Sequence, residues 1–291
     1  MRPVLRELVD LLALERIDDD RFRGTSQDLG WGTIFGGQVL GQALSAASQT
    51  VPEGRSVHSL HAYFLRPGDV REPVVYEVDR IRDGLGFTTR RVVAFQKARP
   101  IFNMAASFQI EEVGPDHQDD MPDVPGPDGL PSEEELARRD VDLLPKHLRQ
   151  RAVALRPIES RPVVHYDLLR PQPCAPTRAV WYRAIDALPD DPAVHRYLLA
   201  YTSDFLFLGT ALQPHGLTLL DPNLRVASID HAMWFHRPFR MDDWLLHVVD
   251  SPSASGARGL VRGRFFSRDG RLVASTAQEG LVRPLKPLRR A

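Results

Sequence analysis

One residue inside a long apolar run has the chemistry of a general base. Asp204 interrupts LLAYTSDFLFL, and an ionised carboxylate among leucine and phenylalanine side chains is costly unless it is strongly hydrogen-bonded. Asp204 is therefore a candidate catalytic residue. The alternative is a helix N-cap, because the sequence TSD also suits capping. The local sequence leaves both interpretations open.

Two further candidates lie on expected strands. Gln278 lies in LVASTAQEGLV, where alternation puts it on one face with Thr276. Ser228 begins the segment SIDHAMWFHRPFRMDDWLLH, residues 228–247, which we interpret as one long strand. On such a strand Ser228 shares its face with Asp230. Taken alone, each of these residues is equally well explained as an ordinary strand residue.

Other site chemistries lack their usual sequence markers. His231 and His236 are five residues apart, which puts them on opposite faces of a strand and argues against a shared metal ion. The chain has no HExxH motif, no GxxxxGK[ST] phosphate loop and no GxSxG nucleophile turn. We therefore interpret both histidines as hydrogen-bonded strand residues, and we expect no metal and no cofactor.

The composition narrows the class of protein. The 291 residues suffice for about two domains, and 37 basic against 38 acidic residues argue against a nucleic-acid partner. The single cysteine, Cys174, excludes an internal disulfide and fits a reducing compartment. Residues 1–20 suit a surface helix rather than a signal peptide. No apolar run reaches the roughly 18 residues that cross a bilayer. The C-terminal LKPLRRA lacks a peroxisomal Ser-Lys-Leu signal. We expect a cytoplasmic protein with no membrane span.

The sequence contains an internal repeat. YFLRP resembles WFHRP, with Arg237 following Arg66 by 171 residues, and the same spacing pairs Ser107 with Gln278. GQAL resembles GTAL at a spacing of 168 residues, which pairs Gly36 with Asp204. Chance similarity between amphipathic strands is the alternative explanation. If the chain is duplicated, only the second copy carries the candidate residues.

The segments that must position these residues form a repeated pattern of one helix and several strands. Residues 35–51 and 196–212 have few charges, which favours helices wrapped by their own sheets. Residues 73–83, 87–112 and 259–283 are rich in β-branched and aromatic residues, with Asp269-Gly270 as a hairpin turn. The pattern predicts an α+β fold in which two long antiparallel sheets, each curled around a helix, join edge to edge.

A proline-rich linker separates the two copies. Five prolines from Pro115 to Pro131 exclude a central strand or helix. Ser132 and Glu135 then form an S-x-x-E capping pattern that starts a short helix. We therefore expect an N-terminal unit at 1–112, a linker with short helices at 113–156, and a C-terminal unit at 157–291 that carries the candidate residues.

Several long stretches, in order from about Leu8 to Arg283, are similar to a known family. They are FRGTSQDLGWGTIFGGQVLGQAL, VHSLHAYFLRPGD, PDGLPSE, YTSDFLFLGTALQPHG, IDHAMWFHRPF and LVASTAQEGLVR. In these motifs the chain resembles the acyl-CoA thioesterase II family. The resemblance implies a double hotdog fold, two tandem units in one chain, and hydrolysis of acyl-CoA to a free fatty acid and CoA.

The resemblance also implies roles for individual residues. The family's catalytic Asp, Ser or Thr, and Gln fall on Asp204, Ser228 and Gln278, and His58 matches a position that we interpret as structural or as part of a substrate channel. Arg237 and its repeat partner Arg66 are candidate contacts for the CoA phosphates, with a solvated or structural role as the alternative. Relatives associate further, so we expect a homo-oligomer, as a dimer or a tetramer.

The chemistry of the residues agrees with this assignment. A thioester is activated enough for a positioned water to attack it, so Asp204 would accept the water's proton while Gln278 and Ser228 hold the water. Two rivals remain: a catalytically silent acyl-CoA-binding hotdog module, and a hotdog hydratase that acts on enoyl-CoA. The usual Asp-plus-His arrangement of the hydratase is not evident in the sequence.

Overall fold

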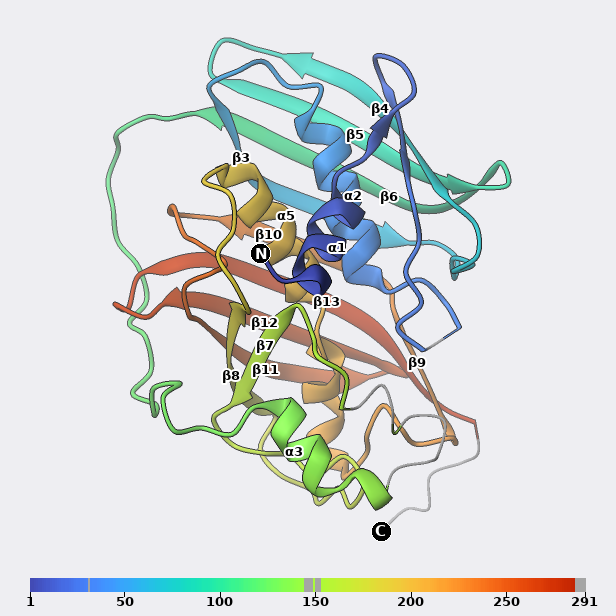
Figure 1. The fold of residues 1–291 in the computed structure, drawn as a ribbon, viewed down its shortest axis with the longest axis vertical. Helices are drawn as coiled ribbons and strands as arrows, with labels where there is room; N and C mark the ends of the chain where they lie inside the picture. The colour runs from blue at the N-terminus through green and yellow to red at the C-terminus, as the bar shows by residue number, and fades with distance from the viewer. Residues whose placement is uncertain (31, 144–148, 150–152, 286–291) are drawn as a thin grey trace.

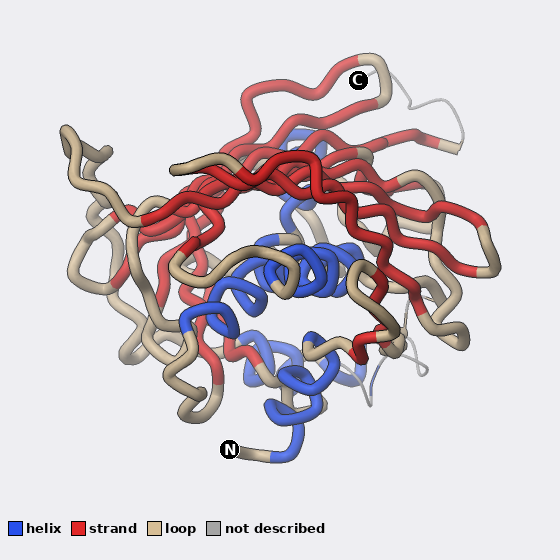
Figure 2. Tube along the Cα trace, turned by 90° about the horizontal axis from the view of Figure 1, so that it is seen from above, coloured by secondary structure: helices blue, strands red, loops and turns tan. Residues whose placement is uncertain are grey.

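The computed structural model describes residues 1–30, 32–143, 149 and 153–285 (Figure 1). In these residues the strands join into one antiparallel sheet in the order β1-β2-β4-β5-β6-β3-β10-β13-β12-β11-β8-β7, with β9 also paired to β13. Figure 2 shows the strands as a curved layer with helices on its concave side. The strands are β1 Glu15–Arg16, β2 Arg21–Gly24, β3 Arg55–Phe64, β4 Val74–Asp83, β5 Phe87–Gln96, β6 Arg99–Ile110, β7 Ile158–Pro162, β8 Thr177–Ala184, β9 Leu224–Ser228, β10 Asp230–Phe235, β11 Leu245–Ser255, β12 Arg258–Ser267 and β13 Leu272–Pro284.

Strands β3 and β10 join two units at the middle of the sheet (Figure 1). The N-terminal unit, β1 to β6, curls around helix α2, and the C-terminal unit, β7 to β13, curls around the 3-10 segment η2. The tandem arrangement confirms the predicted double hotdog. The helical elements are α1 Pro3–Leu12, α2 Gly36–Ser48, α3 Glu133–Arg139, η1 Val141–Leu143, α5 Pro192–Ser203 and η2 Phe207–His215.

Helix α2 is the buried centre of the N-terminal unit. It contains no charged residue, and every position from Gly37 to Ala47 is buried. Its two buried glutamines are hydrogen-bonded. Gln38 accepts from the Gln27 N–H at 3.0 Å, and Gln42 donates to the Leu11 carbonyl at 2.7 Å and accepts from the Tyr76 hydroxyl at 2.7 Å. A helix that is apolar on all sides is stable only when surrounded, and the sheet with α1 and α5 surrounds it.

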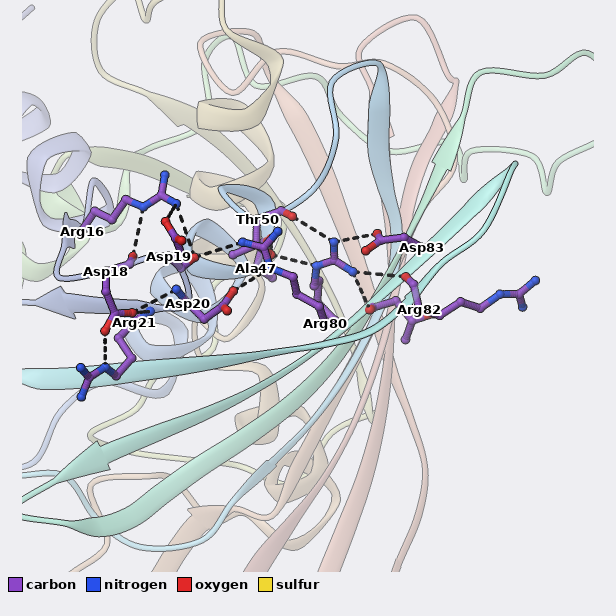
Figure 3. Close-up of polar contacts among 12 residues, drawn as sticks. Arg16, Asp18, Asp19, Asp20, Arg21, Ala47, Thr50, Arg80, Arg82 and Asp83 are labelled. Atoms are coloured by element: carbon purple, nitrogen blue, oxygen red, sulfur yellow. Dashed lines mark hydrogen bonds and ion pairs between the residues drawn. The ribbon is translucent and has the colours of Figure 1, made fainter.

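The C-terminal end of α2 is fixed by a buried arginine of β5. The Arg90 guanidinium donates to the Thr50 carbonyl at 2.9 Å and to the Thr50 hydroxyl at 2.9 Å, and it forms an ion pair with Asp83 at 2.7 Å. Figure 3 shows Thr50 beside Asp83 and Arg82, with Arg80 bonded to Asp20 close by. These bonds hold the C-terminal end of α2 against the sheet.

The predicted helix of residues 196–212 is interrupted, which corrects the sequence interpretation. Helix α5 ends at Ser203, Leu206 adopts a left-handed backbone with φ 51°, and η2 begins at Phe207. Helix α5 packs mainly against α2 and α1, whereas η2 packs against β11, β12 and β13. A left-handed non-glycine residue cannot continue a right-handed helix, so Asp204 lies at a break rather than inside a helix.

The predicted single strand of residues 228–247 is also wrong. Strand β9 ends at Ser228, β10 runs from Asp230 to Phe235, and β11 begins at Leu245. Across β13, Ser228 is opposite Gly280 but Ala232 is opposite Ala277, so the register shifts by one residue at Ile229. Such a bulge reverses which residues face the core, so Ser228 does not share a face with Asp230.

The same irregularity occurs in the N-terminal unit. The register of β3 against β6 shifts between Val57 and Ser59, and these residues precede Ser228 and Asp230 by the 171-residue spacing of the repeat. The two copies therefore share a bulge as well as a fold, with Val57 of the N-terminal unit where the C-terminal unit has Ser228.

The linker follows one side of the molecule from β6 to α3 (Figure 1). It contacts the outer face of the C-terminal sheet, where the Trp181 indole donates to the Pro125 carbonyl at 2.9 Å and the Gln118 amide to the Gly270 carbonyl at 2.8 Å. The predicted capping box is present, with Ser132 at the N-cap of α3 and Glu135 bonded back to it. The end of the predicted linker, 144–148 and 150–152, lies outside the described residues. Over the described part of the chain, no helix is long and apolar enough to span a membrane.

Candidate active site

Gln278 connects the three candidate residues. Its side chain points from β13 into the C-terminal unit and is 1% exposed. The carboxamide Nε2 donates to the Ser228 hydroxyl at 2.7 Å, and the carboxamide also hydrogen-bonds the carboxyl of Asp204. The structure therefore brings together Asp204, Ser228 and Gln278, which are separated in sequence by as many as 74 residues.

Asp204 lies where α5 ends and α2 begins. It is the C-cap residue of α5, so the alternative interpretation as a helix N-cap is wrong. Its carboxyl accepts a hydrogen bond from the Gly37 backbone N–H at the start of α2. A methyl group at Gly36 would stand 2.6 Å from Oδ2 of Asp204, so the carboxyl needs a glycine there.

Burial gives this carboxyl an unusual protonation equilibrium. The neighbouring rings of Phe35 and Phe205 are stacked at 5.3 Å, and Tyr201 lies edge-on to both. Removal from water raises the pKa of Asp204 to about 7, although the hydrogen bonds from Gln278 and Gly37 act to lower that pKa. A group with a pKa near 7 is suited to accept and return a proton at neutral pH.

Ser228 reaches the site because of the bulge at Ile229. Its position opposite Gly280 directs its side chain to the inner face of the sheet, where Gln278 also points. On a regular strand through residue 235 the serine would face outward with Asp230.

His231 is a hydrogen-bond partner of Gln278 that sequence reasoning did not select as a site residue. It is fully buried in β10, with Nδ1 2.6 Å from Oε1 of Gln278 and Nε2 3.0 Å from the Ser203 hydroxyl. Burial lowers the pKa of His231 to about 4, so the ring is neutral at neutral pH. The interpretation as a hydrogen-bonded strand residue is consistent with these contacts. A sequence signal was present, because His231 alternates with the buried Met233 and Phe235.

The other candidates have partners outside this cluster. The imidazole Nε2 of His58 is 2.8 Å from the Ser107 hydroxyl in the N-terminal unit. Arg66 is exposed and donates to the Pro100 carbonyl at 2.7 Å. Arg237 forms an ion pair with Asp116 of the linker and donates to the Leu272 carbonyl at 2.9 Å. His236 bonds the Ser275 hydroxyl at 2.9 Å.

The N-terminal unit has none of the three chemical groups at the equivalent positions. The repeat puts Gly36, Val57 and Ser107 where the C-terminal unit has Asp204, Ser228 and Gln278. Within the described ranges, no group of three or more His, Cys, Asp or Glu side chains is arranged to hold a metal ion.

Comparison with known proteins identifies the family. A family profile described as acyl-CoA thioesterase matches residues 148–281, and one described as acyl-CoA thioesterase N-terminal domain matches residues 25–109. Acyl-CoA thioesterase 2 of Haemophilus influenzae is 44% identical over 283 residues, which cover 97% of this chain and 99% of that protein. This chain belongs to the acyl-CoA thioesterase family. Human acyl-coenzyme A thioesterase 8 is 43% identical over 99% of this chain and 91% of its own length.

Solved structures agree with the family and the fold. An acyl-CoA thioesterase II of Mycobacterium marinum superposes with a TM-score of 0.78 at 44% identity, covering 95% of this chain and 98% of that chain. A protein of Alicyclobacillus acidocaldarius described as having a hot dog fold has a TM-score of 0.76 at 22% identity, over 97% of this chain and 99% of its own. The second likeness concerns the fold alone, because its identity is low.

Proposed function

We propose that this chain hydrolyses fatty acyl-CoA to a free fatty acid and CoA by direct attack of water. One arrangement carries the catalytic assignment: the carboxamide of Gln278 hydrogen-bonds the carboxyl of Asp204, whose pKa is raised to about 7 by removal from water, and also donates to the hydroxyl of Ser228. Attack of water on a thioester requires a general base, with an orienting group and a hydroxyl in contact with it.

Each residue has a defined part in the proposed reaction. Asp204 takes a proton from the water as the water oxygen bonds to the thioester carbon, while Gln278 and Ser228 hold that water in line. The tetrahedral intermediate then collapses, the C–S bond breaks, and the CoA thiolate takes the proton from Asp204. Such general-base assistance contributes roughly 10² to 10⁴ in rate.

The first turn of α2 supports this reaction electrostatically. The Gly37 N–H already bonds Asp204, and the free N–H groups at a helix N-terminus favour negative charge. Backbone amides of this turn are the proposed donors to the oxyanion that develops on the thioester oxygen.

The remaining candidates belong to substrate binding. We propose that Arg66, whose guanidinium is exposed, contacts phosphates of CoA. Arg237 remains a second candidate, although its ion pair with Asp116 competes with such a contact. His58, half-buried against Phe87 and Ser107, is proposed as a structural or channel residue of the N-terminal unit.

We also propose the organisation of the chain in the cell and in solution. The unit boundaries 1–112, 113–156 and 157–291 are consistent with β6 ending at Ile110 and β7 beginning at Ile158. A cytoplasmic location suits the exposed thiol of Cys174. A homodimer or tetramer is supported by Tyr63 and Trp234, which are 54% and 36% exposed on neighbouring strands. Light scattering measures the assembly directly, and a monomeric mass would contradict the oligomer.

Replacement of the proposed base tests the function. We expect Asp204→Asn to reduce kcat for a saturated long-chain acyl-CoA by about 10² or more, measured as release of free CoA thiol. Asp191→Asn is the matched control, because Asp191 caps the other end of α5 through the Ala193 N–H and asparagine caps equally well. Unchanged release by Asp204→Asn would remove the base, and binding without release in the wild type would support the silent binding module. A hydroxyacyl-CoA product from enoyl-CoA would support the hydratase.

A further inference from the structure

We infer that His231 is a positioning residue that fixes the orientation of the Gln278 carboxamide, because it donates from Nδ1 and so keeps the amide NH₂ directed at Asp204 and Ser228. The inference rests on the proposed function, in which Gln278 holds the attacking water. His231 itself has no proposed contact with water or substrate.

The hydrogen-bond inventory determines the direction of the first bond. Oε1 of Gln278 is a carbonyl oxygen and can only accept, so the 2.6 Å contact with Nδ1 of His231 requires a proton on Nδ1. The ring is neutral and therefore carries one N–H, which leaves Nε2 as an acceptor. In this arrangement the Ser203 hydroxyl directs its one proton to Nε2, 3.0 Å away, rather than to the Ala200 carbonyl at 2.8 Å. The chain of donors thus runs from Ser203 through His231 to Gln278 and Ser228.

The reverse arrangement, in which Nε2 of His231 carries the proton, is unfavourable at Asp204. The Ser203 hydroxyl also lies 2.8 Å from the Ala200 carbonyl, and donation there would let Nε2 of His231 carry the proton. Nδ1 would then accept from a rotated Gln278 amide, whose Oε1 would face the ionised carboxylate of Asp204. Two acceptors facing each other in a buried site are unfavourable, so the Nδ1–H tautomer and the active orientation of Gln278 occur together.

Burial makes the orientation of the Gln278 amide depend on His231. His231 and Ser203 are fully buried and Gln278 is 1% exposed, so bulk water does not satisfy the amide in place of the ring. Strand β10 pairs with both β13 and β3, which fixes the backbone of His231 from two sides. The ring of Phe207 packs against His231 at 5.8 Å and against His247 of β11 at 5.4 Å. His247 is the other titratable group near the ring, and burial lowers its pKa as well.

The tautomer is measured without any assay of activity. Long-range ¹H–¹⁵N correlation spectra of histidine-labelled wild-type protein distinguish a protonated Nδ1 from a protonated Nε2, and loss of the signals in His231→Asn assigns them. We expect His231 to be protonated at Nδ1 at pH 7. Protonation at Nε2 would overturn the inference even if every catalytic assignment is correct.

Kinetics of three variants test the positioning role. His231→Leu leaves Oε1 of Gln278 without a donor, and we expect kcat to fall about tenfold, the effect of roughly 1.4 kcal/mol, with KM within about twofold. We expect His231→Asn to recover most of this loss, because its amide can donate from the position of Nδ1. Since the Gln278 bond lowers the pKa of Asp204, the acid limb of kcat/KM should shift to higher pH in His231→Leu. Ser203→Ala should give a smaller loss in the same direction.

His247→Leu is the matched control. It removes a second buried imidazole that packs on the same Phe207 ring. Among the described residues, the Nε2 of His247 has no hydrogen-bond partner, so this imidazole does not bond Gln278 through Nε2. Wild-type kcat in His231→Leu, or an equal loss with an equal pH shift in His247→Leu, would overturn the positioning role. If Asp204→Asn is fully active, the proposed base is wrong, but the measured tautomer still tests whether His231 orients Gln278. If Asp204→Asn is inactive and His231→Leu is not impaired, only the inference fails.

Discussion

Gly36 and Asp204, which the 168-residue spacing of the repeat pairs, face each other in the folded chain. A methyl group on Gly36 would lie 2.6 Å from Oδ2 of Asp204 and 3.0 Å from the ring of Phe64. The N-terminal copy therefore does more than lack a carboxylate: its glycine provides the space that the carboxylate of the other copy occupies. Two copies of one fold thus build a single asymmetric site at their junction.

This relationship predicts a strong effect of the smallest substitution. We expect Gly36→Ala to displace the Asp204 carboxyl and to lower kcat by about tenfold or more, since small displacements of a catalytic group are costly. Gly209→Ala is the control, because no atom lies within 4 Å of a methyl group built there. Steady-state kinetics with one acyl-CoA checks both, and full activity in Gly36→Ala would contradict the close fit.

The activity should depend on the ionisation of Asp204. Its pKa is raised to about 7 by burial, so the base is increasingly protonated and inactive below pH 7. We expect kcat/KM to decline on the acid side with an apparent pKa near 7 and to level off above about pH 8. A profile measured from pH 5 to 9 that stays flat through pH 7 would argue against a buried carboxyl base.

The same pKa predicts a cost in stability. Asp204 binds its proton more tightly in the folded protein than in the unfolded chain, so its contribution to stability is complete below about pH 4 and is lost as the pH rises through 7. At 1.36 kcal/mol per pKa unit, the shift from 3.8 to about 7 corresponds to an upper limit of roughly 4 kcal/mol. We expect Asp204→Asn to raise the Tm at pH 8 and to have little effect near pH 4. An equal change at both pH values would contradict this origin.

The hydroxyl of Ser228 should be required, but not the serine itself. Ser228→Ala removes the group that accepts from Gln278 at 2.7 Å, and we expect kcat to fall about tenfold to a hundredfold. Ser228→Thr keeps the hydroxyl and restricts its rotamers, so we expect near wild-type kcat. Parallel assays of the two variants separate the hydroxyl from side-chain size. Equal loss in both would indicate a packing role.

The two repeat-related arginines should differ. We expect Arg66→Gln to raise KM for acyl-CoA several-fold, and to leave KM for an acyl-pantetheine substrate without nucleotide phosphates unchanged. Arg237→Gln breaks the ion pair with Asp116, and we expect faster proteolytic cleavage of the linker as its main effect. An increase in KM for both substrates in Arg66→Gln would point away from phosphate binding.

The sequence by itself determined the architecture and selected the candidate site residues. The charge-free run around α2 requires a surrounding sheet, the alternating segments required strands, and the prolines between 115 and 131 excluded regular structure there. The repeat and the family resemblance selected Asp204, Ser228 and Gln278 before any contact was known. These features are local or repeated patterns, so they can be recognised from the amino-acid sequence without the structure.

Only the tertiary structure decided how these residues meet. The alternating pattern gave no sign of the bulge at Ile229, because one extra residue changes the face of Ser228 without changing the composition of the strand. The break after Ser203 and the glycine that faces Asp204 depend on packing between segments about 168 residues apart. Likewise, His231 could be recognised as the partner of Gln278 only after β10 and β13 were paired, since a hydrogen bond between distant segments leaves no local pattern.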